Sequence, residues 1–291
     1  MEGANFCVNC GMPLPKTEAK PIGWLGRKLS IREHVYNTDY KAHVLQYTKK
    51  QGAHSLLSWF VFFVYFFVAA VVVLIVLDIL GIQSFDGYYE QTPVFDGTLA
   101  VLMLAGCFVI LLINKAKLAS VGFGASSIMQ AIWFGIIMGA VAIMGGIMFG
   151  FMADAEVIFL PITVIIITII SALWEDIFFV GFLQTRLHGL FRHERLAILI
   201  GSLCFALFHF FPWIDAGLDP VLFAFWIVSH IAYNAIYRRH QSIIPVTIIH
   251  STNNIMTYMG LGQVSFAIFI AVAAWVMYIR RRAKKALPHD V

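Results

Sequence analysis

The stretch Leu56–Leu77, LLSWFVFFVYFFVAAVVVLIVL, decides the fold class, because it holds no charged residue and is long enough to cross a bilayer. A membrane-spanning helix needs about 20 predominantly apolar residues. Further apolar runs follow at about 98–113, 128–152, 157–184, 196–211, 220–237, 243–260 and 263–279. The sequence therefore predicts an all-α, polytopic membrane protein of about eight transmembrane helices.

Composition agrees with this prediction. The 291-residue chain is 60% hydrophobic and 12% charged, whereas soluble domains are about 45–50% apolar and about 25% charged. A soluble globular protein is excluded on these values. The length is better divided into membrane spans with short loops than into soluble domains.

The cationic residues indicate the orientation in the membrane. All 20 Lys and Arg residues lie in the N-terminal segment, in alternate loops or in the C-terminal tail, and the opposite loops carry Asp and Glu without a cation. Because cationic loops stay on the cytoplasmic side, both termini are expected to be cytoplasmic. The protein itself is expected in the cell membrane. The net charge of +4 then reflects the topology in the membrane. Membrane lipids are the expected partners, and no nucleic-acid partner is expected.

Four segments are expected along the chain. They are a half zinc-ribbon-like head (1–20), a basic juxtamembrane segment (21–54), a transmembrane domain (55–280) and a basic cytoplasmic tail (281–291). The head contains Cys7 and Cys10, which are half of the four ligands that a structural zinc takes. A second chain in a homo-oligomer, or His34 or His43, could complete such a site, and a degenerate remnant is the equal alternative.

Several polar residues fall inside the apolar runs, where an ionisable group is costly and is by default a functional candidate. The main ones are Glu175, Asp176, His209, His250 and Asn254. With a helical rise of about 1.5 Å per residue, Glu175 and His250 lie roughly 16 Å, and His209 roughly 21 Å, from the nearest cytoplasmic cation. In a core about 30 Å thick, all three are near the middle of the membrane.

Spacing adds chemical detail to this set. His250 and Asn254 are four residues apart and share one helix face, whereas the neighbours Glu175 and Asp176 point about 100° apart. A buried carboxylate with imidazoles suits acid–base hydrolysis, and a His with an Asn amide could stabilise an oxyanion. Glu175, His209 and His250 could equally hold a catalytic zinc. A lone intramembrane His is more often a packing residue, but a set at matching depth argues for function.

Three short motifs on these residues occur in order. They are EDIFFVGFL at 175–183, FALFH at 205–209 and HSTNN at 250–254. In them the chain resembles the CAAX protease and bacteriocin-processing (CPBP, or ABI) family of intramembrane endopeptidases, over about residues 120–260. The family motifs are Glu-Glu-x-x-x-Arg, Phe-x-x-x-His and His-x-x-x-Asn.

The resemblance implies an all-helical fold of about eight spans and cleavage of a peptide bond in a membrane-associated protein or peptide. Substrate classes of the family are prenylated C-terminal peptides, bacteriocin-like leader peptides and membrane-anchored regulators. It also implies that Glu175 activates water with help from His209. His250 and Asn254 would stabilise the oxyanion or, in a metalloprotease version, help bind zinc.

Two departures from the family pattern open an alternative. Asp176 stands for the second Glu, and Val180 stands for the Arg, which removes a cation and five hydrogen-bond donors. A catalytically silent relative that binds or scaffolds membrane partners is therefore the second reading. His230 and Asn234 either supply replacement polarity or only bond to the backbone. A transporter ranks last, since no matched pair of broken helices is visible.

Overall fold

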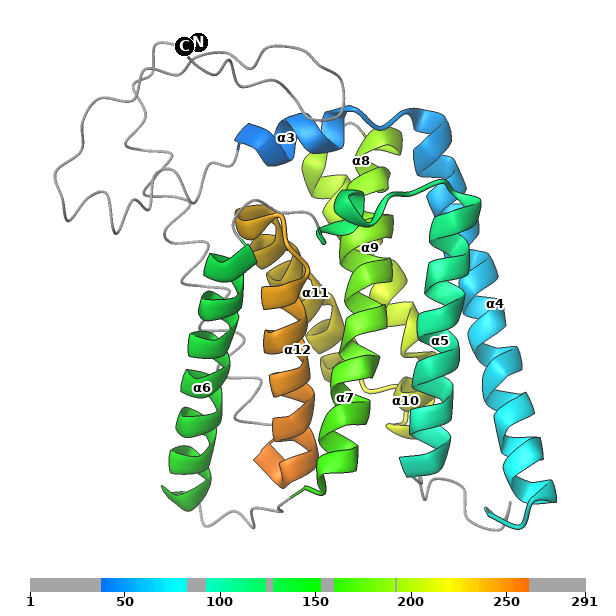
Figure 1. The fold of residues 1–291 in the computed structure, drawn as a ribbon, viewed down its shortest axis with the longest axis vertical. Helices are drawn as coiled ribbons and strands as arrows, with labels where there is room; N and C mark the ends of the chain where they lie inside the picture. The colour runs from blue at the N-terminus through cyan, green and yellow to red at the C-terminus, as the bar shows by residue number, and fades with distance from the viewer. Residues whose placement is uncertain (1–37, 83–92, 124–127, 153–159, 192, 262–291) are drawn as a thin grey trace, which may run out of the picture.

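The structure is a computed structural model that describes residues 38–82, 93–123, 128–152, 160–191 and 193–261. Cys7, Cys10 and the last apolar run, 263–279, lie outside the described residues. Within the described ranges every element is a helix, with no strand (Figure 1). This confirms the all-α class.

Among the residues that the structure describes, four helical segments are long and apolar enough to span a membrane. They are α4 (Lys49–Ile79), α5 (Pro93–Ile113), the continuous segment Ile162–Leu190, and α11 (Pro220–His240) over Pro220–Arg238. The chain is therefore an integral membrane protein. The count of about eight spans and the cytoplasmic termini stay predictions.

The remaining long helices are α6 (Ile128–Met152), α9 (Glu194–Phe208) and α12 (Ile244–Met256). In Figure 1, α6 stands beside α12, α12 beside α7 (Ile162–Glu175), and α5 lies between α7 and α4, while α9 packs against α11. The short helix α3 (Thr38–Leu45) crosses one end of this assembly next to α8 (Thr185–Leu190).

The segment Ile162–Leu190 changes its helical geometry near its middle. It begins as α7 (Ile162–Glu175), continues as the π-helix η2 (Asp176–Gln184) and ends as α8 (Thr185–Leu190). Every residue of η2 is buried. A π-helix is rare and frequently occurs at functional sites, so the change directly after Glu175 is informative.

Two features stabilise η2. Gly181 lets the 3₁₀ turn η1 (Leu118–Val121) approach closely, because a Cβ at position 181 would lie 2.6 Å from the Val121 carbonyl oxygen. Beyond its end, Thr185 Oγ1 donates to the Gly181 carbonyl (2.7 Å) and Arg186 donates to the Phe182 carbonyl (3.1 Å). These side chains satisfy carbonyls at the end of the wider helix.

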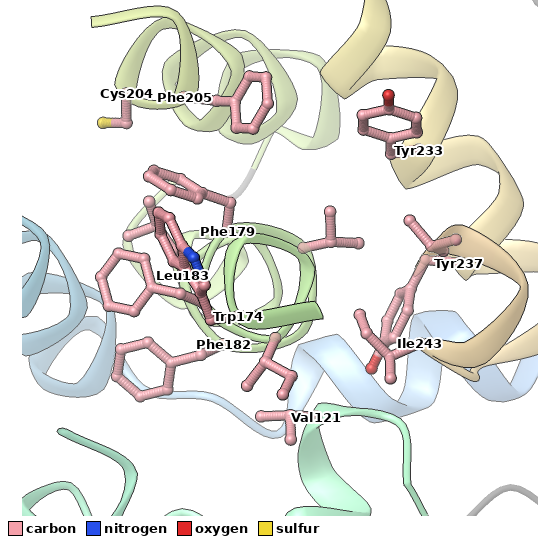
Figure 2. Close-up of a cluster of buried hydrophobic side chains, with 14 of the residues drawn as sticks. Val121, Trp174, Phe179, Phe182, Leu183, Cys204, Phe205, Tyr233, Tyr237 and Ile243 are labelled. Carbon is pink, nitrogen blue, oxygen red and sulfur yellow. The ribbon is translucent and has the colours of Figure 1, made fainter. Parts of the chain in front are cut away.

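Aromatic rings pack η2 against its neighbours. The Phe62 ring of α4 lies 4.3 Å from the Phe178 ring and 5.9 Å from the Phe208 ring of α9. Figure 2 shows further buried side chains gathered around this helical turn, among them Phe179 and Phe182. Close packing of this kind restricts movement, so the start of η2 is held in place.

Candidate active site

The polar residues singled out in the sequence come from three separate helices. Glu175 is the last residue of α7, and Asp176 is the first residue of η2. His209 lies at the break between α9 and α10 (Phe210–Asp215), with φ −88° and ψ 29°. His250 is midway along α12. The apolar run 196–211 is therefore interrupted at His209.

These helices bring one carboxylate and two imidazoles together. The Oε2 atom of Glu175 lies 3.9 Å from Nε2 of His209 and 3.8 Å from Nε2 of His250. All three side chains are largely buried, with relative exposures of 13%, 21% and 4% respectively. The three groups are thus close enough to share one small polar molecule or ion.

Asp176 contacts the other nitrogen of His250. Its Oδ1 atom lies 3.0 Å from Nδ1 of that ring, and the buried carboxylate accepts this hydrogen bond. Glu175 and Asp176 therefore lie at opposite nitrogens of a single imidazole. The two carboxylates point apart, as neighbours on a helix do, yet both serve the same site. A carboxylate at Nδ1 fixes the orientation and the tautomer of the ring.

The backbone fixes the tautomer of His209. Its Nδ1 atom lies 2.9 Å from the Phe205 carbonyl oxygen, which can only accept, so Nδ1 carries the proton. Nε2 then presents a lone pair toward Glu175. This bond, together with a ring contact of 4.7 Å, gives a physical reason for the Phe-x-x-x-His spacing.

The separations at Glu175 exceed a direct hydrogen bond. Donor–acceptor distances are typically 2.7–3.2 Å, whereas the two carboxylate–imidazole distances are 3.8 and 3.9 Å. Polar groups separated by more than 3.5 Å commonly interact through water. Because Oε2 of Glu175 has no hydrogen-bond partner among the described residues, it can accept a proton from such a water.

Two aromatic rings of α11 hold the imidazoles. Trp226 stacks on His209 (4.8 Å between ring centroids, 25° between planes), and Tyr233 stacks on His250 (4.5 Å, 30°). These aromatic residues are seven positions apart, so they share one face of the helix. The sequence interpretation missed them, although an aromatic pair at this spacing on a span with polar residues was a usable signal.

The other candidates lie at or beyond the edge of this cluster. Asn254 is one turn after His250 and is partly exposed, and its side chain forms no hydrogen bond with another described residue. Val180 is 1% exposed within the hydrophobic core. His230 and Asn234 bond to each other, and within the described ranges no hydrogen bond joins His230 to Glu175.

Zinc ligation stays a prediction. Among the residues that the structure describes, no group of three or more His, Cys, Asp or Glu side chains is arranged to hold a metal ion as it stands. We therefore derive no chemical step through a metal. Glu175, His209 and His250 nevertheless supply the atom types that zinc accepts.

Of three comparisons with known proteins, one found a match. No curated protein and no solved structure matches the chain. One family model, described as type II CAAX prenyl endopeptidase Rce1-like, matches residues 157–256, the part that holds Glu175, His209 and His250. Over these residues the chain is similar to a family of CAAX prenyl endopeptidases, which supports an intramembrane CAAX-type protease.

Proposed function

We propose that this protein is an intramembrane endopeptidase that hydrolyses a peptide bond near the prenylated C-terminus of a membrane-associated protein. The observation that carries the proposal is the convergence of Glu175, His209 and His250 from three helices, with 3.8 and 3.9 Å between the carboxylate and the two imidazoles. The family match over 157–256 supports the substrate class.

The proposed chemistry is general base catalysis by Glu175. A water held between Glu175 and His209 loses a proton to the carboxylate while its oxygen attacks the scissile carbonyl carbon. The tetrahedral intermediate collapses as the C–N bond breaks. Glu175 then returns the proton to the leaving amine. The immediate products are a carboxylic acid and a free amine, which exchange a proton to become a carboxylate and an ammonium, so atoms and charges balance.

His250 and Asp176 act on the oxyanion side. An imidazolium at His250 would donate through Nδ1 to Asp176 and through Nε2 to the developing oxyanion. Asn254 follows one turn later on α12, so its amide could add a second donor once substrate is bound. Because the surroundings exclude bulk water, these interactions are stronger than the same contacts in solution.

A direct test measures cleavage of a farnesylated CAAX peptide in proteoliposomes. We expect Glu175→Ala, His209→Ala and His250→Ala to abolish cleavage. Matched controls are Asp78→Ala and His54→Ala, which remove an exposed carboxylate and an exposed imidazole on α4 and should cleave like the parent. If all three site variants also cleave like the parent, the proposal is wrong.

Chelation distinguishes a zinc-dependent mechanism from the metal-free one. If Glu175 acts on water without a metal, dialysis against a strong chelator should leave the rate unchanged. Loss of activity that added zinc restores, together with zinc measured in the purified parent but not in His209→Ala, would instead favour a catalytic zinc on Glu175, His209 and His250.

Val180 favours a second candidate function, in which the protein is catalytically inactive and binds membrane partners. The position that is Arg in the family is here an apolar side chain packed in the core, and the Oδ2 atom of Asp176 has no hydrogen-bond partner among the described residues. An Arg at position 180 could donate to it. If the parent is inactive and Val180→Arg cleaves the peptide, the silent reading holds for the natural chain.

A further inference from the structure

A second polar cluster lies inside the protein, between η2, α9 and α11. It consists of Gln184, Ser202, His230 and Asn234, each with 1% exposure or less. The Nδ1 atom of His230 lies 3.0 Å from both Ser202 Oγ and Asn234 Nδ2. Because an amide nitrogen can only donate, Nδ1 of His230 accepts. This cluster has no role in the proposed hydrolysis as described so far.

Gln184 is the unusual member of the cluster. A Cβ on Gly201 would lie 2.1 Å from Gln184 Oε1 and 3.5 Å from His230 Cε1, so the amide is held against a bare backbone beside the imidazole. Neither Oε1 nor Nε2 of Gln184 has a hydrogen-bond partner among the described residues, and the same is true of Asn234 Oδ1.

Leaving such groups unsatisfied in an apolar interior is costly. An unmade hydrogen bond to a buried donor or acceptor costs roughly 1–3 kcal/mol, and the cluster has three such atoms on two amides. Buried water typically makes about three hydrogen bonds to polar groups of this kind. The cluster has donors and acceptors but no carboxylate, so its chemistry fits a neutral hydrogen-bonding molecule such as water rather than a cation.

The position of the cluster along the helices relates it to the cationic end of the protein. Ser202 is seven residues before His209 on α9, roughly 10 Å at the helical rise. Asn234 is four residues before Arg238, and Gln184 is two before Arg186, both of which lie at the cationic, predicted cytoplasmic end. The cluster therefore lies between that end and the catalytic residues.

One ring connects the two polar clusters. Phe205 stacks on His230 (5.1 Å, 21°) and also contacts His209 (4.7 Å) and His250 (6.2 Å). The ring of Phe205 is therefore shared by the two clusters.

We propose that Gln184, Ser202, His230 and Asn234 form a buried water-binding site from which the catalytic cluster draws its hydrolytic water. Each peptide bond cleaved consumes one water, and lipid around the spans does not supply it. The water-binding part of this inference stands alone, whereas the supply part rests on the proposed endopeptidase function.

Thiol accessibility tests the water-binding part without any assay of proteolysis. In a chain with Cys7, Cys10, Cys107 and Cys204 replaced by Ala, Ser202→Cys places a thiol in the cluster. The matched control keeps only native Cys204, a buried thiol two residues further along α9. Figure 2 shows its sulfur pointing away from Phe205.

The reagent is Ag⁺ in nitrate buffer, applied to proteoliposomes before denaturation and maleimide labelling of the thiols that remain. Ag⁺ is excluded from apolar protein and lipid and reacts where water reaches the sulfur. We expect Ser202→Cys to be blocked at least about tenfold faster than Cys204, since the reactive thiolate forms only where it is solvated. Equal and slow blocking of the two thiols would overturn the water-binding site.

A kinetic comparison tests the supply part. Gln184→Leu removes both amide atoms and should lower kcat with KM unchanged, whereas Leu183→Met, a buried apolar neighbour on η2, should leave kcat close to the parent value. Equal kcat values for these two variants would overturn the supply role. If the parent cleaves no peptide, the proposed function fails, yet Ag⁺ blocking still decides whether the cluster binds water.

Discussion

The two polar clusters differ in charge and in burial, since Glu175 and His209 are 13% and 21% exposed whereas each member of the water-binding cluster is 1% exposed or less. Both contain an imidazole in contact with the Phe205 ring. The catalytic cluster adds Glu175 and Asp176, at opposite nitrogens of His250, whereas the water-binding cluster has only amides and a hydroxyl. Under the proposed function, a carboxylate pair placed where α7 turns into η2 distinguishes the catalytic cluster from the water-binding cluster.

The largest effect is expected from removing the base while keeping its shape. Glu175→Gln preserves volume but cannot take a proton from water, so kcat should fall on the order of 10²–10⁴-fold. Cleavage of a farnesylated peptide in proteoliposomes measures this. The matched change in the other cluster, Gln184→Glu, adds a carboxylate there. If it rescued Glu175→Gln, the distinction between the clusters would be wrong.

A smaller loss is expected when the orienting carboxylate is neutralised. Asp176→Asn keeps a hydrogen-bonding side chain at Nδ1 of His250 but no longer balances an imidazolium. We expect kcat to fall about 10–100-fold, the usual range for residues that orient a catalytic group. The pH–rate profile should also change, which a purely structural defect would not cause. An unchanged profile with full activity contradicts the orienting role.

Loss of aromatic stacking should have a weaker effect. Trp226→Leu removes the ring stacked on His209 and keeps an apolar side chain. Aromatic contacts of this type contribute about 0.5–1.5 kcal/mol, so kcat should fall about twofold to tenfold with little change in KM. Trp226→Phe restores a ring and should recover most of the rate. If Phe and Leu at this position behave alike, stacking does not position His209.

The smallest effect is expected at the backbone of the water-binding cluster. In Gly201→Ala the new Cβ meets Gln184 Oε1, which is the end of a flexible side chain. We expect a lower thermal midpoint, by about 2–4 °C if the cost is about 1 kcal/mol, and a smaller decrease in kcat than in Gln184→Leu. A calorimetric scan of the purified protein checks the midpoint. Stabilisation by this change would contradict the placement of Gln184.

The sequence predicts the apolar helices well because their length and lack of charge are local properties. The spans at Leu56–Leu77 and 98–113 appear in the structure as parts of α4 and α5. Matching depth is consistent with the 3.9 and 3.8 Å distances from Glu175 to His209 and His250, and the catalytic role of these residues stays a prediction. Depth along separate helices can be estimated from the rise per residue.

Other features depend on packing between helices, which no single run of residues encodes. The π-helix after Glu175 has no clear local signal in the sequence, whereas the break at His209 is marked by Pro212, which cannot donate to the Phe208 carbonyl four residues earlier. Trp226 and Tyr233 lie on α11, between the second and third motifs but outside both of them. The count of spans, the zinc at Cys7 and Cys10 and the oligomeric state stay predictions.

The π-helix η2 has a consequence for insertions and deletions. A π-helix contains one residue more per local turn than an α-helix would need, so removing one residue from 176–184 would let this segment return to regular α-helical geometry. Because each residue turns an α-helix by about 100°, α7 would then rotate relative to α8, and Glu175 would point away from His209 and His250. Deletion of one apolar residue such as Phe179 should therefore abolish the proposed peptide cleavage, although no polar side chain is removed.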